Sequence, residues 1–133
     1  MPDQISHWAG ARRLVATREN RLRNASWLTL GFLGLVFVAG QLGLYVQYPR
    51  LDIPTHFLGG LLLARVFSAQ LLHRLTAFVL TALAALGWEL GEYLWDAGFG
   101  TSLNHGLGDT LSDIFFGLLG AGIALSWRIV WPD

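Results

Sequence analysis

Three hydrophobic segments beyond residue 50 carry acidic or histidine side chains at one of their ends. In chain order these side chains are Asp52 and His56, then Glu89 and Glu92, then His105, Asp109 and Asp113. If consecutive segments form antiparallel helices, the start of the first, the end of the second and the start of the third meet at one level. Because a charge within an apolar helix is costly, such residues usually mark a metal, a catalytic centre or an ion pathway.

The spacing within each segment predicts that its polar residues share one helix face. The two members of each helical pair are three or four residues apart, and such residues are neighbours on a helix surface. With a rise of about 1.5 Å per residue, one member of each pair lies about a turn deeper than the other. The expected deep residues are His56, Glu89 and Asp113, and the expected shallow ones are Asp52, Glu92 and Asp109, with His105 over the mouth.

Five carboxylates so close together cannot all stay ionised in a low dielectric without a cation. A divalent metal, protonation of some acids, or pairing with Arg50 or Arg65 would each relieve the repulsion. Carboxylates with one or two imidazoles suit Zn²⁺, Mn²⁺, Mg²⁺ or Fe²⁺, and the absence of Cys excludes thiolate sites. We therefore expect a metal site built from these seven residues, with Glu89 or Glu92 as a catalytic base. The alternatives are a structural polar network, an ion or proton path, and simple helix N-caps at Asp52 and Asp109.

The composition is that of a membrane protein. The 133 residues are 53% hydrophobic and 14% charged, with a mean hydropathy of +0.47. We expect an all-α fold, an integral membrane four-helix bundle with spans at 26–47, 53–73, 76–96 and 109–130. Residues 1–25 carry five Arg and are expected to form a separate basic, amphipathic helix on the membrane surface, or else a solvated tail. The division is thus 1–25 and 26–133.

The distribution of Arg predicts the orientation. The N-terminal segment holds five Arg, and Arg74 and Arg128 lie at the same predicted side, whereas only Arg50 lies at the other. The positive-inside rule therefore places both termini in the cytoplasm and the polar cluster at the extracytoplasmic side. The net charge is zero, so we expect membrane lipids and no nucleic acid as partners.

Glycines are expected to mark the helix contacts. They are Gly59, Gly60, Gly87, Gly91, Gly117, Gly120 and Gly122. Small residues let helix backbones approach closely in membranes. Because Gly87 and Gly91 flank Glu89, we expect the Glu89 face to pack on a neighbouring helix.

The ordered motifs between residues 50 and 122 resemble a known family. They are Asp52-x-x-x-His56-Phe57-x-x-Gly60, Trp88-Glu89-x-x-Glu92, Gly108-Asp109-Thr110-x-x-Asp113 and Gly120-Ala121. This pattern is similar to the YjdF-like family of small bacterial inner-membrane proteins, and more distantly to the VanZ-like family. The resemblance implies a multi-span helical fold and a location in the bacterial inner membrane. It implies no particular reaction.

Two functions from different classes fit these observations about equally. The first is a metal-dependent enzyme that acts on a lipid or lipid-linked phosphate or ester. The second is a non-catalytic structural or accessory subunit of a larger membrane protein complex, in which the polar cluster holds the helices together. A transporter fits less well, since the chain is short and shows no inverted repeat.

Overall fold

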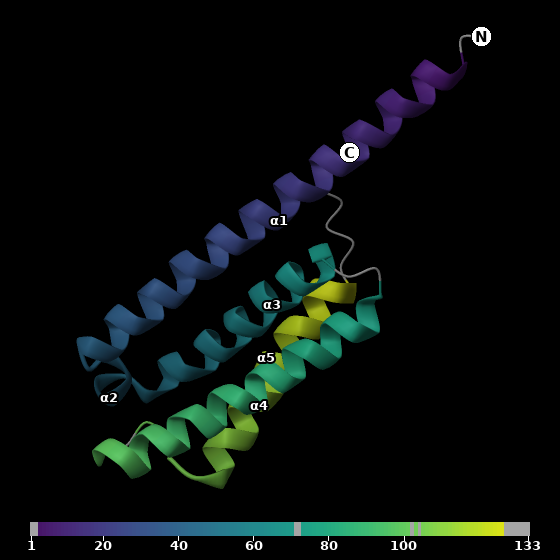
Figure 1. Cartoon of the computed structure of the whole chain (residues 1–133). Coiled ribbons are helices and arrows are strands. Elements are labelled where there is room, and N and C mark those ends of the chain that lie inside the picture. Colours follow the sequence, from purple (N-terminus) through teal and green to yellow (C-terminus); the bar gives the residue numbers. More distant parts are fainter. Residues whose placement is uncertain (1–2, 71–72, 102, 104, 127–133) are drawn as a thin grey trace.

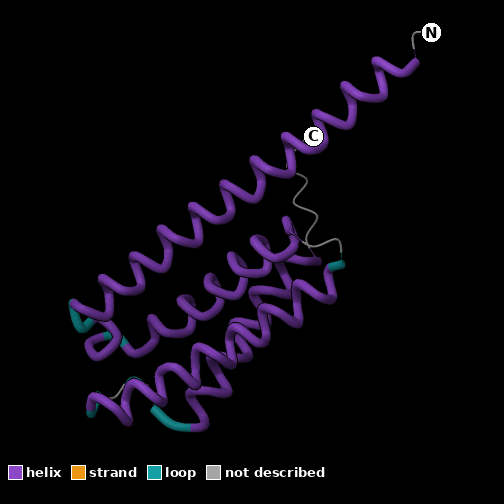
Figure 2. Tube along the Cα trace, viewed as in Figure 1, coloured by secondary structure: helices purple, strands orange, loops and turns teal. Residues whose placement is uncertain are grey.

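The computed structural model describes residues 3–70, 73–101, 103 and 105–126, and the side chains of 16, 17 and 19 onward within these ranges (Figure 1). All regular elements in these residues are helical, as expected for an all-α protein (Figure 2). They are α1 (Asp3–Gln41), α2 (Leu44–Gln47), the 3-10 helix η1 (Pro49–Leu51), α3 (Asp52–Gln70), α4 (Arg74–Phe99) and α5 (Leu107–Ser126).

Each of the four long helices runs antiparallel to the next one along the chain, and α3 lies at the centre of the bundle. It packs against α1, α4 and α5, and its contact with α5 is the most extensive. The start of α1 extends beyond the rest of the bundle, at the end where α3 finishes and α4 begins (Figure 1). The start of α3, the end of α4 and the start of α5 lie at the opposite end, as the antiparallel arrangement predicts.

The contact between α3 and α5 depends on glycine. A Cβ atom on Gly60 would overlap the carbonyl group of Gly117, and one on Gly120 would overlap the carbonyl oxygen of Phe57. The predicted close packing is therefore confirmed at these three glycines. The remaining buried apolar residues are also small, namely Ala25, Ala64, Ala77 and Ala121. A core of small residues with backbones in contact is typical of membrane helices.

The predicted helix contact is wrong at Gly87, Gly91 and Gly122, because none of them has an atom of another segment within 4 Å of a built Cβ in the described part of the chain. The expectation that the Glu89 face packs inside the bundle is confirmed, since Glu89 is buried. The buried face of α4 instead passes through Ala77, Thr81 and Glu89. Residues two apart on a helix point in nearly opposite directions, so glycines that flank a buried Glu89 in this spacing face away from the bundle.

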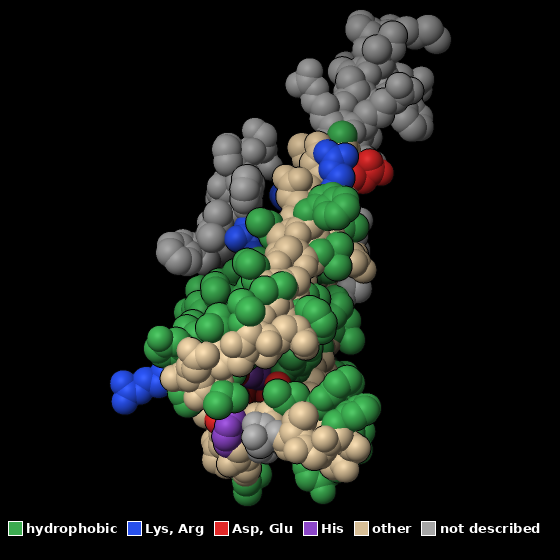
Figure 3. Space-filling model, turned by 90° about the vertical axis from the view of Figure 1, so that its left-hand side faces the viewer, with side chains coloured by type: hydrophobic (Ala, Val, Ile, Leu, Met, Phe, Trp, Pro, Cys, Tyr) green, Lys and Arg blue, Asp and Glu red, His purple; other side chains and the backbone are tan. Residues whose placement is uncertain are grey.

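The outer surface of the described bundle is apolar. Many large hydrophobic side chains are more than half exposed, among them Trp27, Leu35 and Phe37 of α1, and hydrophobic groups spread over the middle of the face in Figure 3. Three helical stretches are long and apolar enough to cross a membrane: Glu19–Gln41, Arg74–Phe99 and Leu107–Ser126. They overlap three of the four predicted spans. The described part of α3, the predicted second span, is not among them.

The structure does not separate residues 1–25 from the first span. One helix, α1, passes through residues 25 and 26 without a break, so the division predicted there is not visible in the backbone. The surface location of residues 1–25 stays a prediction. Arg128, which entered the orientation argument, lies outside the described residues.

Candidate metal centre

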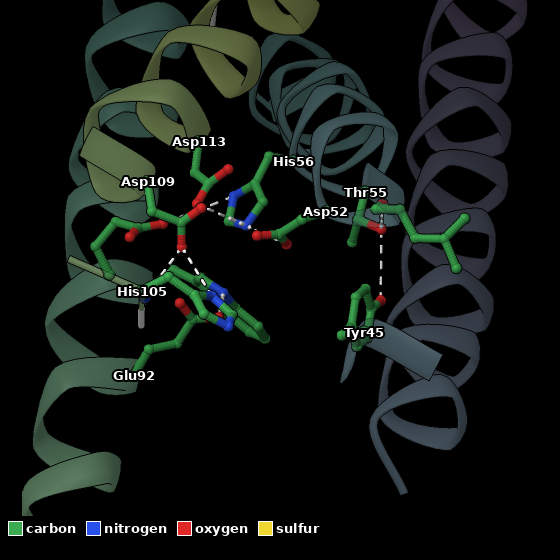
Figure 4. Close-up of polar contacts among 11 residues, drawn as sticks. Tyr45, Asp52, Thr55, His56, Glu92, His105, Asp109 and Asp113 are labelled. Atoms are coloured by element: carbon green, nitrogen blue, oxygen red, sulfur yellow. Dashed lines mark hydrogen bonds and ion pairs between the residues drawn. The ribbon is translucent and has the colours of Figure 1, made fainter. Parts of the chain in front are cut away.

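His56 is the centre of the polar cluster. Its Nε2 atom lies 3.2 Å from Oδ1 of Asp52, one turn earlier on α3, and 3.9 Å from Oδ2 of Asp113 on α5. Figure 4 shows both carboxylates beside the same imidazole ring. One ligand atom from each of these three residues lies within 4.8 Å of the others, which makes them a group that could hold a metal ion.

The glycine contact between α3 and α5 explains why His56 and Asp113 meet. Gly60 follows His56 by four residues, and Gly117 follows Asp113 by four residues, so the two backbones touch one turn deeper than the polar pair. A Cβ on Gly117 would also lie 3.6 Å from the carbonyl oxygen of His56. The short distance between the helices brings a short Asp side chain within reach of the ring.

Glu89 lies at the other nitrogen of the same ring. Its Oε1 is 3.7 Å from Nδ1 of His56, which is longer than a hydrogen bond. The hydroxyl of Thr110 on α5 is close to this carboxylate, but neither oxygen of Glu89 has a partner with full hydrogen-bond geometry among the described residues. Burying an ionised carboxylate without a hydrogen bond costs roughly several kcal/mol of folding free energy. This arrangement is therefore incomplete without a proton or a cation nearby.

Glu92 lies on the same helix but has a different partner. Its Oε1 accepts a hydrogen bond of 2.7 Å from the indole Nε1 of Trp88. Glu92 is not a member of the three-residue group around Nε2 of His56. This role of Trp88 was not predicted from the sequence, although its spacing of four residues from Glu92 on a helix could have indicated it.

His105 and Asp109 form a separate pair at the mouth. Oδ2 of Asp109 accepts a hydrogen bond of 3.2 Å from the backbone N–H of His105 and lies 3.2 Å from its Nδ1, as drawn in Figure 4. Asp109 thus fastens the loop that leads into α5. At the other end of this loop, Oδ1 of Asp96 accepts hydrogen bonds from the hydroxyl of Thr101 and the backbone N–H of Leu103, after Gly100 ends α4 in a left-handed conformation.

The three residues expected to lie deep are more buried than Asp52, Asp109 and His105. The side chains of His56, Glu89 and Asp113 are between 3 and 11% exposed, whereas those of Asp52 and Asp109 are 26 and 30% exposed and that of His105 is 53% exposed. Neither Asp52 nor Asp109 acts as a simple N-cap. Asp52 has helical backbone angles, since η1 leads directly into α3, and its carboxylate contacts His56.

The seven predicted residues therefore form three separate groups in the structure. Around Nε2 of His56 it brings together Asp52 and Asp113, with Glu89 at the opposite nitrogen. Glu92 lies beside Trp88, and His105 with Asp109 forms the outer pair. Acidic and histidine atoms are visible within a hollow near this end in Figure 3.

Comparison with known proteins agrees with a membrane location. The model of a family described as predicted membrane protein (DUF2238) matches residues 11–133. This match includes every residue of the polar cluster and most of α1. No curated protein and no solved structure matches the chain.

Proposed function

Because the chain belongs to the DUF2238 family of predicted membrane proteins, we propose that it holds a divalent metal ion at the extracytoplasmic end of a membrane-spanning helical bundle. The resemblance to YjdF-like proteins supports a location in the bacterial inner membrane. The metal, its reaction and the orientation are parts of this proposal.

The observation that carries the proposal is the approach of Asp52 and Asp113 to Nε2 of His56. With bonds of about 2.1 Å, adjacent ligands of one ion lie about 3.0–3.4 Å apart and opposite ligands about 4.2 Å apart. The distances of 3.2 and 3.9 Å fall close to these values. One imidazole and two carboxylates suit Zn²⁺, Mn²⁺, Fe²⁺ or Mg²⁺. Three protein ligands would leave further coordination positions open, as catalytic sites do.

Glu89 supports the same interpretation from the other side of the ring. Histidines that bind metals through one nitrogen usually donate the other N–H to a carboxylate. The carboxylate of Glu89 faces Nδ1 of His56, and neither of its oxygens has a partner with full hydrogen-bond geometry among the described residues. In our proposal Glu89 orients His56 and partly balances the charge of the ion. It therefore acts through His56, whereas the sequence analysis had placed it among the ligands.

We propose hydrolysis of a phosphate or ester group on a lipid or lipid-linked substrate. A bound divalent ion would supply an activated water and polarise the substrate oxygen. Glu92 is the candidate general base, because it is near the cluster and its carboxylate is held by Trp88. Asp109 and His105 are the candidate groups for contact with the substrate at the mouth.

The proposal includes four spans with both termini in the cytoplasm. The described part of helix α3 is not among the helices that qualify as spans, but it lies between α1, α4 and α5. A helix in this position need not offer its polar side chains to lipid, so α3 can cross the membrane with the others. The excess of Arg near α1 supports the orientation.

A non-catalytic role is favoured by one observation. His56 contacts acidic residues of all three helices that meet at this end, α3, α4 and α5. A protonated His56 would thus hold the helices together without a metal, as expected for a structural subunit of a larger membrane complex.

Elemental analysis of the detergent-purified protein tests the metal site. We expect close to one divalent ion per chain, and loss of this ion in Asp113→Asn. The matched control is Asp109→Asn, which removes an acid from the same helix outside the three-residue group. A parent protein without bound metal, and without affinity for added Mn²⁺ or Zn²⁺, would overturn the proposal in favour of the structural network.

A further inference from the structure

A pocket of about 100 Å³ lies directly beside His56. Its walls come from α1, α3 and α4, with Gly117 of α5 at one edge. On α3 it extends from Thr55 to Leu63, which corresponds to about 12 Å along the helix axis. The pocket therefore leads from the polar cluster towards the middle of the bundle.

The walls of this pocket are apolar except at the His56 end. The hydroxyl groups of Thr55 and Thr81 donate hydrogen bonds of 2.7 and 2.9 Å to the carbonyl oxygens four residues earlier in the chain, those of Leu51 and Ala77. The indole N–H of Trp88 is used by Glu92. His56 is the lining side chain that faces the carboxylates. A ligand that fills the pocket must therefore be apolar along its length and polar at one end.

The pocket opens between α1 and α4. Helix α1 packs on α3 and makes little contact with α4. Leu33 of α1 and Trp88 of α4 both line the pocket, yet they are 41 and 46% exposed. Both lie in helices that are apolar and long enough to span a membrane. In a membrane, an opening between these two helices would face the hydrocarbon of the bilayer, where the available ligands are lipid chains.

We infer that this pocket binds one hydrocarbon chain of a membrane lipid and thereby places the head group of that lipid at the metal centre. The inference rests on the proposed function and defines its substrate class. This pocket, at about 100 Å³, is smaller than a cavity of about 150 Å³ that takes one benzene molecule, so it can hold only a short stretch of a single acyl or prenyl chain and is too small for a sterol ring system. The substrate would enter sideways from the membrane.

Binding of dodecyl phosphate in the presence of Mn²⁺ tests the inference, with inorganic phosphate as the probe that lacks a chain. The protein is kept in digitonin, whose bulky ring system cannot occupy the pocket. Val36→Phe and Ala84→Leu fill the pocket from α1 and α4. Val38→Phe makes the same change two residues away, at a position that is 52% exposed and outside the pocket.

We expect the parent and Val38→Phe to bind dodecyl phosphate at least tenfold more tightly than inorganic phosphate. Both filling variants should lose on the order of tenfold to a hundredfold of this affinity, because each displaces several methylene groups. Their binding of inorganic phosphate and Mn²⁺ should stay unchanged.

Two results would overturn the inference while the metal site stands. One is a parent that binds Mn²⁺ but binds dodecyl phosphate no better than inorganic phosphate. The other is a pair of filling variants with the Mn²⁺ content and thermal stability of the parent and with its full affinity for dodecyl phosphate. A parent that binds no Mn²⁺ overturns the proposed function itself. The first comparison needs no variant, so it decides the matter even if both filling variants fail to fold.

Discussion

Replacing Glu89 with Gln distinguishes the metal-site hypothesis from the structural-network hypothesis, because the two predict opposite effects on the stability of the metal-free protein. Glu→Gln keeps the shape of the side chain and removes its charge. If Glu89 orients a metal-binding His56, the metal-free variant loses only a buried carboxylate that has no hydrogen bond among the described residues, and it should be at least as stable as the parent. If a protonated His56 holds the helices together, the variant loses one of the three acidic partners of that charge and should be less stable than the parent, by at most roughly 3–5 kcal/mol.

The expected loss of metal affinity follows from the contact with Nδ1. Two unit charges 3.7 Å apart would interact by about 4.5 kcal/mol at an effective dielectric constant of 20, and this value is an upper limit because a metal-binding imidazole is neutral. Removal of such a partner from a metal-bound histidine usually lowers the affinity for the metal by about 10- to 100-fold, which corresponds to about 1.4–2.7 kcal/mol of binding free energy. At a concentration of Mn²⁺ 1,000 times the parent Kd, the ion stabilises the parent by about 4.1 kcal/mol. A 100-fold weaker variant would gain only about 1.4 kcal/mol.

Denaturant or thermal unfolding with and without Mn²⁺, together with titration of the ion, measures both quantities. The control is Glu92→Gln, which removes a carboxylate from the same helix. That carboxylate accepts a hydrogen bond from Trp88 and does not face Nδ1 of His56. We expect its metal-induced stabilisation to stay within about 0.5 kcal/mol of the parent. Full retention of Mn²⁺ affinity in Glu89→Gln would refute the role of Glu89, and a less stable metal-free variant would support the network instead.

Three further predictions concern packing, orientation and the ligands. Gly60→Ala should cost roughly 1–3 kcal/mol of unfolding free energy, because its Cβ would overlap the carbonyl of the facing helix, whereas Gly87→Ala should cost nothing measurable in the same unfolding assay. In intact cells an impermeant thiol reagent should label Leu103→Cys and not Thr17→Cys in this Cys-free chain; the reverse pattern would place the site in the cytoplasm. Asp113→Asn should lower Mn²⁺ affinity more than Glu89→Gln does, since it removes a ligand, and equal losses by titration would argue against a direct bond.

Much of the site could be predicted from helical periodicity alone. Spacings of three and four place acids and histidines on single faces, and antiparallel helices bring these faces to one level. That reasoning correctly placed His56, Glu89 and Asp113 deeper than Asp52 and Asp109. It also identified the glycines that bring α3 and α5 together, because only small residues permit such contact.

The sequence could not show how the side chains divide around His56. Depth along a helix is set by residue number, but the direction in which each helix faces its neighbours depends on tertiary packing. Glu89 and Asp113 are equally deep, yet they approach opposite nitrogens of the ring. The same limit explains the error at Gly87 and Gly91, whose faces point away from the bundle.

The two features that the sequence did not show, the division around His56 and the apolar pocket, favour the same function. A purely structural network would be expected to close the space around its buried charges, since a buried polar group is stabilised by surrounding partners. Here His56 lines an apolar pocket on one side and faces acidic residues on the other. A group placed at such a boundary can contact both the polar head and the start of the chain of one lipid molecule. This position favours chemistry on a lipid over a role confined to holding α3, α4 and α5 together.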